Sequence, residues 1–311
     1  MNTIADIAGK VVCGGKDVPL TGKLGCLSLF STPDSFIAVR KGFKIPATQE
    51  LTIDYITEQV KKGIFIALLD ASVFEDTSSE DSYSTNAAGV KRLNLKGLAE
   101  FRFTFEESNC FYRNIDRLTS FKNYDIIIID DNGDFMMAVN SDGSYSGFEV
   151  GHITAEMRKN KVSGGDSESR SILMQFLNRR QLDRDYAIIH ADQLTFTTSD
   201  IPAINAVAIE PVTTPVAAGA KFKVTVKLAC DKTTPVVGLL PADFYITVNG
   251  TGAIATSATE LPDGSYDLEA AAALVSTDVV TVTLWDGSSI QIADQGGVLY
   301  KAYMPLDFIV A

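Results

Sequence analysis

Large apolar and polar residues nearly alternate over residues 98–106, LAEFRFTFE. Phe101, Phe103 and Phe105 are apolar, and Arg102 and Thr104 separate them. A repeat of two residues is the period of a strand that buries one face. The segment therefore predicts a strand whose phenylalanines enter a core.

Four consecutive isoleucines at residues 126–129 predict a second core strand. The run is too short for a buried helix, and isoleucine is β-branched, which favours a strand. Asn132 and Gly133 then form a strong hairpin signal, so residues 135–139 are expected to return beside the first strand. Residues 110–118, between the two patterns, predict a short amphipathic helix.

Further strands and one longer helix are predicted in the first 200 residues. Thr48 offers an N-cap for a helix over residues 49–62, where apolar residues recur at helical spacing. The charged residues 179–185 predict a helical turn or a loop. Apolar or alternating segments predict strands at residues 36–39, 64–69, 148–154, 171–178 and 186–189.

Residues 75–89, EDTSSEDSYSTNAAG, interrupt these patterns with a polar and acidic stretch. Such a stretch contributes little to a core, so it predicts a long exposed loop, or an arm that becomes ordered against a partner. Long loops without a role are uncommon in compact domains. We therefore favour order through contact with another protein.

The composition changes after residue 200, which predicts a first domain over residues 1–200, with an N-terminal extension at 1–48, and a second over 207–311. Residues 197–222 are rich in Ala, Thr, Pro and Val, and the prolines argue against a helix there. Short strands are predicted at 221–229, 244–248, 266–270 and 279–285, with Asn-Gly or Asp-Gly turns between them. This spacing indicates an immunoglobulin-like β-sandwich, so the whole chain is expected to be mainly β with one or two short helices.

The 311 residues carry a net charge of −12, which excludes the basic surface expected of a nucleic-acid-binding protein. No apolar run reaches the roughly 18 residues of a membrane helix, and MNTIADIAGK shows no signal-peptide pattern, so synthesis in the cytoplasm and no membrane partner are expected. Four widely spaced cysteines, without a CxxC pair, predict reduced thiols.

No motif in the sequence predicts chemistry. His152 and His190 lie in predicted strands without a cysteine or carboxylate at metal-ligand spacing, so both are expected to be packed or surface histidines. Residues 130–134, DDNGD, offer oxygen ligands, but the glycine comes fourth and not sixth as in a calcium loop, which favours a hairpin turn. We expect no catalytic, cofactor or metal site, and no enzymatic activity.

The order of these segments resembles that of virion structural proteins of tailed bacteriophages, and most of all tail-tube subunits. The resemblance covers residues 40–195. It is carried by GLAEFRFTFEE, CFYRNIDRLTSF, YDIIIIDDNGDFM, GFEVGHITAE and RDYAIIHAD. It implies a β-sandwich flanked by a helix, whose copies form six-membered rings that stack into a tube. DNA would pass through this tube without specific binding, and the second domain would lie outside it.

The resemblance also implies a location in the virion. The expected partners are other copies of the same chain and other virion proteins, and the resemblance implies which residues contact the other copies. The polar stretch and the basic pair after it would contact the next ring, through Glu75, Asp76, Glu80, Asp81, Tyr83, Lys91 and Arg92. The core strands would build the sheet that pairs between subunits, through Phe101, Phe103, Phe105, Ile127 and Ile129.

Three alternatives remain open from the sequence. Two are other virion roles, a capsid decoration protein or a head–tail connector. The third is a carbohydrate-binding or adhesion protein that acts through the second domain, with Tyr245, Tyr266 or Trp285 stacking on sugars. A buried position for Trp285 in the sandwich core is the favoured interpretation, which speaks against the third alternative.

Overall fold

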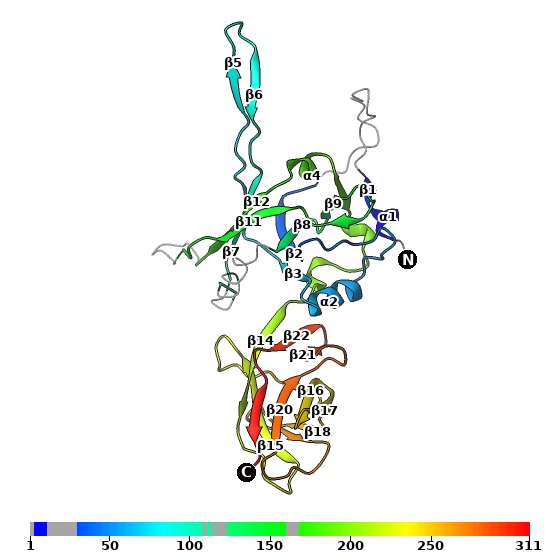
Figure 1. Cartoon of the computed structure of the whole chain (residues 1–311), viewed down its shortest axis with the longest axis vertical. Coiled ribbons are helices and arrows are strands. Elements are labelled where there is room, and N and C mark those ends of the chain that lie inside the picture. Colours follow the sequence, from blue (N-terminus) through cyan, green and yellow to red (C-terminus); the bar gives the residue numbers. More distant parts are fainter. Residues whose placement is uncertain (1–2, 11–29, 108–110, 113–114, 116–122, 160–167) are drawn as a thin grey trace. The chain divides into compact units, whose positions relative to one another are not determined.

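A computed structural model describes residues 3–10, 30–107, 111–112, 115, 123–159 and 168–311. The chain divides into two units, Met1–Ile201 and Pro202–Ala311, and each is described by itself. Their elements are mainly strands (Figure 1), which confirms the predicted fold class. The helix predicted at 110–118 lies largely outside the described residues.

The first unit contains two antiparallel sheets. The larger has the order β1 (Gly9–Lys10), β13 (Tyr186–Ile189), β9 (Phe135–Val139), β8 (Tyr124–Asp130), β2 (Pro33–Arg40) and β3 (Phe65–Leu68), and β10 (Tyr145–Ser146) pairs with β9. The smaller has the order β11 (Val150–Ala155), β12 (Arg170–Phe176), β7 (Glu100–Phe105) and β4 (Val73–Asp76). Pairing of β8 with β9 confirms the hairpin predicted at Asn132 and Gly133.

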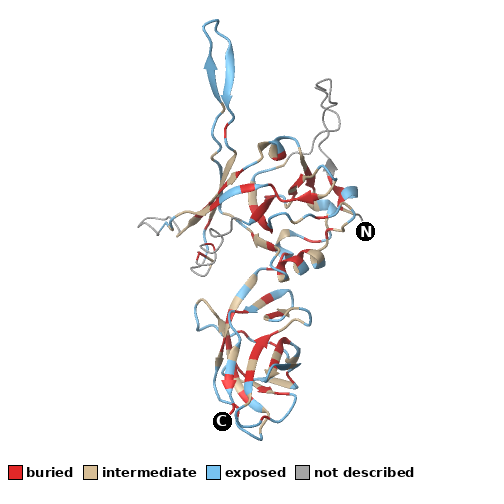
Figure 2. Ribbon diagram, in the orientation of Figure 1, coloured by how far each residue is buried: buried red, intermediate tan, exposed pale blue. Residues whose placement is uncertain are grey.

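The two sheets enclose one apolar core, shown in red in Figure 2. Phe36 from the larger sheet meets Phe103 from the smaller sheet, with ring centroids 5.1 Å apart. Phe103 and Phe105 are fully buried, as the alternation of residues 98–106 predicts. The first unit is therefore a β-sandwich.

Both faces of β8 are buried, which explains its uninterrupted isoleucine run. Ile126 and Ile128 belong to the core between the sheets, whereas Ile127 and Ile129 point to the opposite face. Helix α2 (Ile53–Lys61) packs near that sheet, where Tyr55 contacts Phe65 of β3 edge to face. A strand that is buried on both faces has a continuous run of apolar residues in its sequence, without alternation.

Three short helices accompany the larger sheet, α1 (Ile4–Ile7), α2 and α4 (Arg179–Asp183). The N-cap of α2 is Thr52, whose hydroxyl accepts the N–H of Tyr55, and not Thr48 as predicted. Both threonines satisfy the local capping rule, so tertiary packing selects between them. Two single turns follow β13, η1 (Ala191–Gln193) and η2 (Thr198–Asp200).

The second unit is also a sandwich of two sheets. The first has the order β18 (Ser257–Glu260), β19 (Ser265–Glu269), β15 (Lys221–Leu228), β14 (Ile204–Pro211), β22 (Val298–Ala302) and β21 (Ile292–Gln295). The second has the order β17 (Thr251–Ile254), β16 (Phe244–Val248), β20 (Val279–Leu284) and β23 (Leu306–Ile309), and η3 (Pro241–Asp243) precedes β16. Their inner faces share one apolar core.

The proline-rich residues 197–222 contain strand β14 and no α-helix, and Pro211 is the last residue of that strand, where a missing N–H is tolerated. One prediction about the cysteines is wrong. Cys230 is disulfide-bonded and not a reduced thiol, since the fold and not sequence spacing decides which cysteines meet. Cys13, Cys26 and Cys110 lie outside the described residues.

Candidate functional site

A hairpin arm projects from the smaller sheet of the first unit (Figure 1). It comprises residues 77–99, between β4 and β7, and contains β5 (Ser82–Thr85) and β6 (Lys91–Leu95). In the described part of the chain, these two strands pair only with each other. The stretch predicted as a polar loop or arm is thus the first half of a regular hairpin, whose second strand the sequence analysis did not recognise.

The two faces of the arm differ in polarity. Tyr83 and Leu93 are direct partners in the ladder, so they share a face, and Leu95 lies two residues further along the same face. The opposite face is polar, and its members are Ser84, Arg92 and Asn94, with the Ser84 hydroxyl hydrogen-bonded to the Asn94 side chain. The arm is therefore an amphipathic hairpin.

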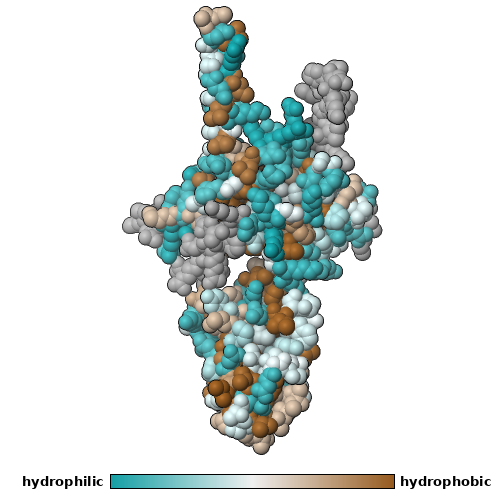
Figure 3. Space-filling model, viewed as in Figure 1, coloured by the Kyte–Doolittle hydropathy of each residue, from teal (hydrophilic) through white to brown (hydrophobic). Residues whose placement is uncertain are grey.

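The apolar face has no cover within the described part of the first unit. Every residue of β5 and β6 is exposed (Figure 2), and hydrophobic residues lie along the arm in Figure 3. Tyr83, Leu93 and Leu95 are 57%, 47% and 70% exposed. Full burial of a large apolar side chain contributes about 1.5–3 kcal/mol, and an isolated two-stranded hairpin is only marginally stable. Contact with a partner would stabilise this arm.

The arm is basic although the chain is acidic. Residues 82–96 contain Lys91, Arg92 and Lys96 and no acidic residue, which gives a charge of +3. The whole chain carries −12, so the residues outside this segment carry −15. Residues 82–96 and the rest of the chain are therefore electrostatically complementary.

The root of the arm is fixed by hydrogen bonds. The N–H of Ser79 donates to the carbonyl of Leu98, and the N–H of Leu98 donates to the Ser79 hydroxyl. Asp81 accepts the N–H of Gly97 at 2.7 Å and an Arg179 N–H at 2.6 Å. The Gly97 hydrogen bond first, and then Arg179, hold the pKa of Asp81 below its ordinary value.

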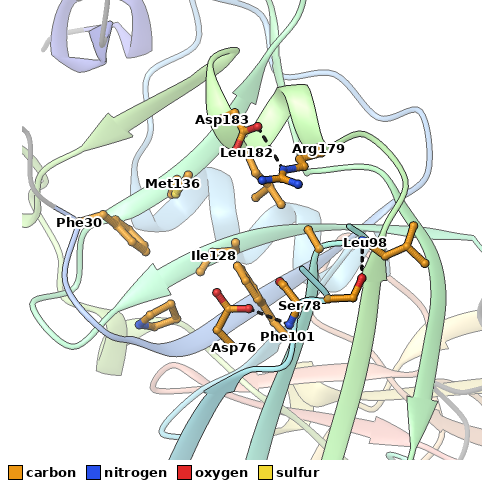
Figure 4. A pocket seen from close by; sticks show the side chains of 13 residues that line it. Phe30, Asp76, Ser78, Leu98, Phe101, Ile128, Met136, Arg179, Leu182 and Asp183 are labelled. Atoms are coloured by element: carbon orange, nitrogen blue, oxygen red, sulfur yellow. Dashed lines mark hydrogen bonds and ion pairs between the residues drawn. The ribbon is translucent and has the colours of Figure 1, made fainter. Parts of the chain in front are cut away.

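A cavity of about 320 Å³ lies beside this root, between the two sheets and α4 (Figure 4). Its apolar lining includes Phe101, Ile128 and Met136, which come from β7, β8 and β9. Its polar groups bind one another: Arg179 lies 3.4 Å from Asp183, and Asp76 accepts the N–H of Ser78. The polar groups of this cavity therefore have partners within the chain.

The outer face of the smaller sheet is polar and mainly acidic around one arginine. Because the phenylalanines of β7 point inward, Glu100, Arg102 and Thr104 point outward. Arg102 lies 2.8 Å from Glu75 and 3.0 Å from Glu156. The hydrogen bond that Arg102 donates to Glu75, followed by smaller contributions that include Glu156, raises the pKa of Arg102.

Strands β7 and β8, which carry the residues predicted for sheet pairing, lie inside their sheets. β7 has β12 and β4 as neighbours, and β8 has β9 and β2. Their backbone groups are therefore used within the chain, and a pairing with another copy would use the edges, β11 and β4 in the smaller sheet. The five residues build the two sheets, and their predicted role in pairing between subunits stays a prediction.

The residues predicted for contact between rings fall into two groups. Glu75 and Asp76 belong to β4, and Asp81 fixes the arm root, so these three have roles within the chain. Glu80 is exposed at the root, and Tyr83, Lys91 and Arg92 are exposed on the arm. Leu93 and Leu95 were missed, although the period-two pattern of KRLNL could have indicated them.

The histidines and the DDNGD segment have structural contacts. The Asp130 carboxylate accepts the N–H groups of Asn132 and Asp134 in the hairpin turn. His190 Nδ1 lies 2.7 Å from Asp134, and His152 forms a hydrogen bond with the Thr154 hydroxyl. Within the described ranges, no three His, Cys, Asp or Glu side chains converge as metal ligands.

Comparisons with known proteins identify no family. The chain matches no protein-family model. No curated protein matches it. Among solved structures, the Escherichia coli adhesin FdeC is similar with a TM-score of 0.22 and 13% identity, over 79% of this chain and 90% of that one. No helix in the described residues is long and apolar enough to span a bilayer.

Proposed function

We propose that the protein is a structural subunit that assembles with copies of itself through the hairpin arm. The observation that carries this proposal is the exposed amphipathic arm, whose apolar face contains Tyr83, Leu93 and Leu95. An exposed apolar face on a marginal two-stranded element favours a partner that covers it.

The partner is a second copy of this chain. Residues 82–96 of the arm carry +3 and the remainder of the same chain −15, so this part of one copy is attracted to the acidic remainder of another copy. A contact between an arm and a different surface of the next copy is heterologous, and heterologous contacts generate rings or filaments. This is the type of contact required in stacked rings.

The specific assembly that we propose is the tail tube of a phage virion. The sandwich with a projecting arm agrees with the subunit that the sequence resemblance implies. The outer face of the smaller sheet, with Glu75, Glu100 and Glu156 around Arg102, would line the channel. A mainly acidic wall repels phosphate groups and would let DNA pass without binding.

Electron microscopy of the purified full chain over a range of concentrations tests this proposal. The wild type is expected to form six-membered rings or hollow tubes. A Leu93→Asp, Leu95→Asp variant is expected to remain monomeric, because it places carboxylates on the apolar face of the arm.

A matched control changes the other face of the same strands. Ser84→Asp with Asn94→Asp introduces the same two charges and should leave assembly intact. A monomeric wild type at every concentration, or equal behaviour of the two variants, would contradict the proposal. Closed particles without a continuous channel would instead favour a capsid decoration or connector role.

A further inference from the structure

The outer face of the four-stranded sheet in the second unit carries a pair of aromatic rings. Tyr245 of β16 and Trp285, directly after β20, have centroids 4.9 Å apart and planes at 75°. Both residues are half-buried, which corrects the prediction that Trp285 lies in the sandwich core. Alternation along β16 explains this position, since Phe244 and Ile246 occupy the core and Tyr245 faces outward.

Two neighbours contact the Tyr245 ring and hold it in place. A Cβ atom at Gly252 would approach the Tyr245 ring within 2.4 Å, so this ring lies directly against the glycine backbone of β17. Trp285 contacts the ring from β20. A ring that is already held in place loses little conformational entropy when a ligand binds.

A buried hydroxyl without a hydrogen-bond partner lies beside these rings. Thr283 is the direct ladder partner of Tyr245 and precedes Trp285 by two residues, so all three share the outer face. Thr283 is only 4% exposed, and its hydroxyl has no hydrogen-bond partner among the residues that the structure describes. Buried polar groups are normally satisfied, and one that is unsatisfied indicates a missing partner.

The surrounding face offers further hydroxyl groups and a negative charge. Thr247 and Thr281 are ladder partners on the same face, and the Thr281 hydroxyl donates to Asp307 at 2.7 Å. Residues 201–311 contain five basic and eleven acidic side chains. This charge disfavours anionic ligands.

We propose that Tyr245, Trp285 and Thr283 form a binding site for a neutral saccharide. A pyranose ring has apolar C–H faces that pack on aromatic rings, whose faces are electron-rich. Its hydroxyl groups lie at the ring edge, where they can hydrogen-bond to threonine side chains. Tyr266, the third aromatic residue considered for sugar binding, takes no part because it is fully buried and donates its hydroxyl proton to the Val236 carbonyl.

Tryptophan fluorescence tests this proposal directly, because Trp285 is the only tryptophan in the chain. Each sugar probe is added to the full-length protein up to a sugar concentration of about 10 mM, which is enough to detect a Kd of about 1 mM. The probes are hexasaccharides of α-linked glucose, β-linked glucose, mannose, xylose, galactose and N-acetylglucosamine. At least one is expected to give a saturable change in emission. No saturable change with any of them would overturn the proposal.

Three variants localise the binding, and calorimetry with the responding sugar gives a readout independent of fluorescence. Tyr245→Ala should weaken binding about tenfold or more through lost ring contact. Thr283→Val keeps the shape and removes the hydroxyl, so about a fivefold loss is expected. Tyr303→Ala alters an exposed tyrosine outside this sheet and should bind as the wild type does.

Unchanged affinity in both Tyr245→Ala and Thr283→Val would place the sugar elsewhere and overturn the assignment. An oligomer of galacturonic acid serves as the anionic probe. Tighter binding of this probe than of every neutral hexasaccharide would overturn the assignment to neutral sugars. None of these measurements depends on self-assembly, so the outcome is separate from that of the proposed structural role.

Discussion

Arg179 Nη1 lies 2.6 Å from the Asp81 Oδ1 atom, which also accepts the N–H of Gly97 at 2.7 Å. Arg179 belongs to α4, and Asp81 and Gly97 lie on the two segments that form the arm root. The arginine and the aspartate are 98 residues apart in the sequence. One carboxylate oxygen thus joins a helix of the sandwich to both sides of the hairpin. We therefore expect this junction to hold the arm root in place.

Loss of the arginine should loosen the arm root without unfolding the sandwich. Arg179→Gln removes the ion pair, and because the side chain is partly exposed, a small change in global stability is expected. Amide hydrogen exchange at Gly97 and Leu98 should become faster, while exchange in β8 stays slow. Faster exchange throughout the first unit would show instead that Arg179 stabilises the whole sandwich.

The same junction should depend on pH. The pKa of Asp81 is lowered in the folded state from its usual value of 3.8. A lowered carboxyl pKa contributes stability above the unfolded pKa, and this contribution is lost as the pH falls through the folded value. Exchange or proteolysis at the arm root should therefore increase below about pH 4 in the wild type, and less so in Asp81→Asn, which has already lost the charge.

A methyl group at Gly97 should disrupt the root sterically. A Cβ atom there would lie 1.8 Å from the Ser79 carbonyl oxygen, far inside van der Waals contact with backbone. Gly97→Ala is expected to destabilise the first unit by about 1–3 kcal/mol and to separate the two segments that form the arm root. Thermal unfolding measures the first effect, and protease cleavage within residues 77–99 measures the second.

A suitable comparison for this variant is Gly219→Ala in the second unit, where the nearest atom would lie 3.3 Å from the new Cβ. This change should have a smaller effect on unfolding. Equal destabilisation by the two substitutions would mean that the close approach at the arm root is relieved by a small backbone shift.

Reversal of the arm charge should weaken assembly. Lys91→Glu with Arg92→Glu changes the charge of residues 82–96 from +3 to −1 and removes attraction to the acidic remainder of the chain. The concentration needed for assembly, measured by light scattering, should rise about tenfold or more. Lys221→Glu with Lys223→Glu makes the same change outside the arm and should have a smaller effect.

Salt provides an independent check of the same interaction. At 0.5 M salt, wild-type assembly should weaken, because charges separated by more than about 4–5 Å are screened. The charge-reversed variant should respond less. Assembly that strengthens with salt in the wild type would indicate that apolar contacts dominate the contact between copies.

Neutralising Asp125 should stabilise the first unit at neutral pH. Asp125 is buried in β8, and one of its carboxylate oxygens has no hydrogen-bond partner in the described part of the chain. Burial raises its pKa above the usual 3.8. A raised carboxyl pKa means that the folded state binds the proton more tightly, so stability falls as the pH rises through this range. Asp125→Asn should increase the melting temperature at pH 7 by about 2–4 °C, as about 1 kcal/mol does for a domain of this size.

The pH dependence distinguishes this cause from a packing effect. The gain should shrink as the pH falls toward 4, where the aspartate of the wild type becomes protonated. Thermal unfolding at pH 7, 5.5 and 4 measures this trend. A constant gain at all three values would attribute the effect to packing or hydrogen bonding of the asparagine.

Local patterns determined much of the mainly β fold. The alternation around Phe103 and Phe105 and the run of isoleucines in β8 predicted two core strands, because strand geometry forces side chains to opposite faces at every second residue. Asn132 and Gly133 predicted a turn, because few residues adopt its backbone conformation. These signals depend on neighbours in sequence, so the sequence alone was sufficient.

Only the tertiary structure decided the features that join distant residues. The pairing of Tyr83 with Leu93, the ion pair of Asp81 with Arg179 and the half-buried position of Trp285 on the outer face all depend on strand register and packing. Register is fixed by the free energy of the whole sheet and not by any single segment, and a shift of one residue would exchange the faces. The sequence therefore indicated an exposed loop or arm, whereas the fold determined that it is a hairpin and which of its residues share the apolar face.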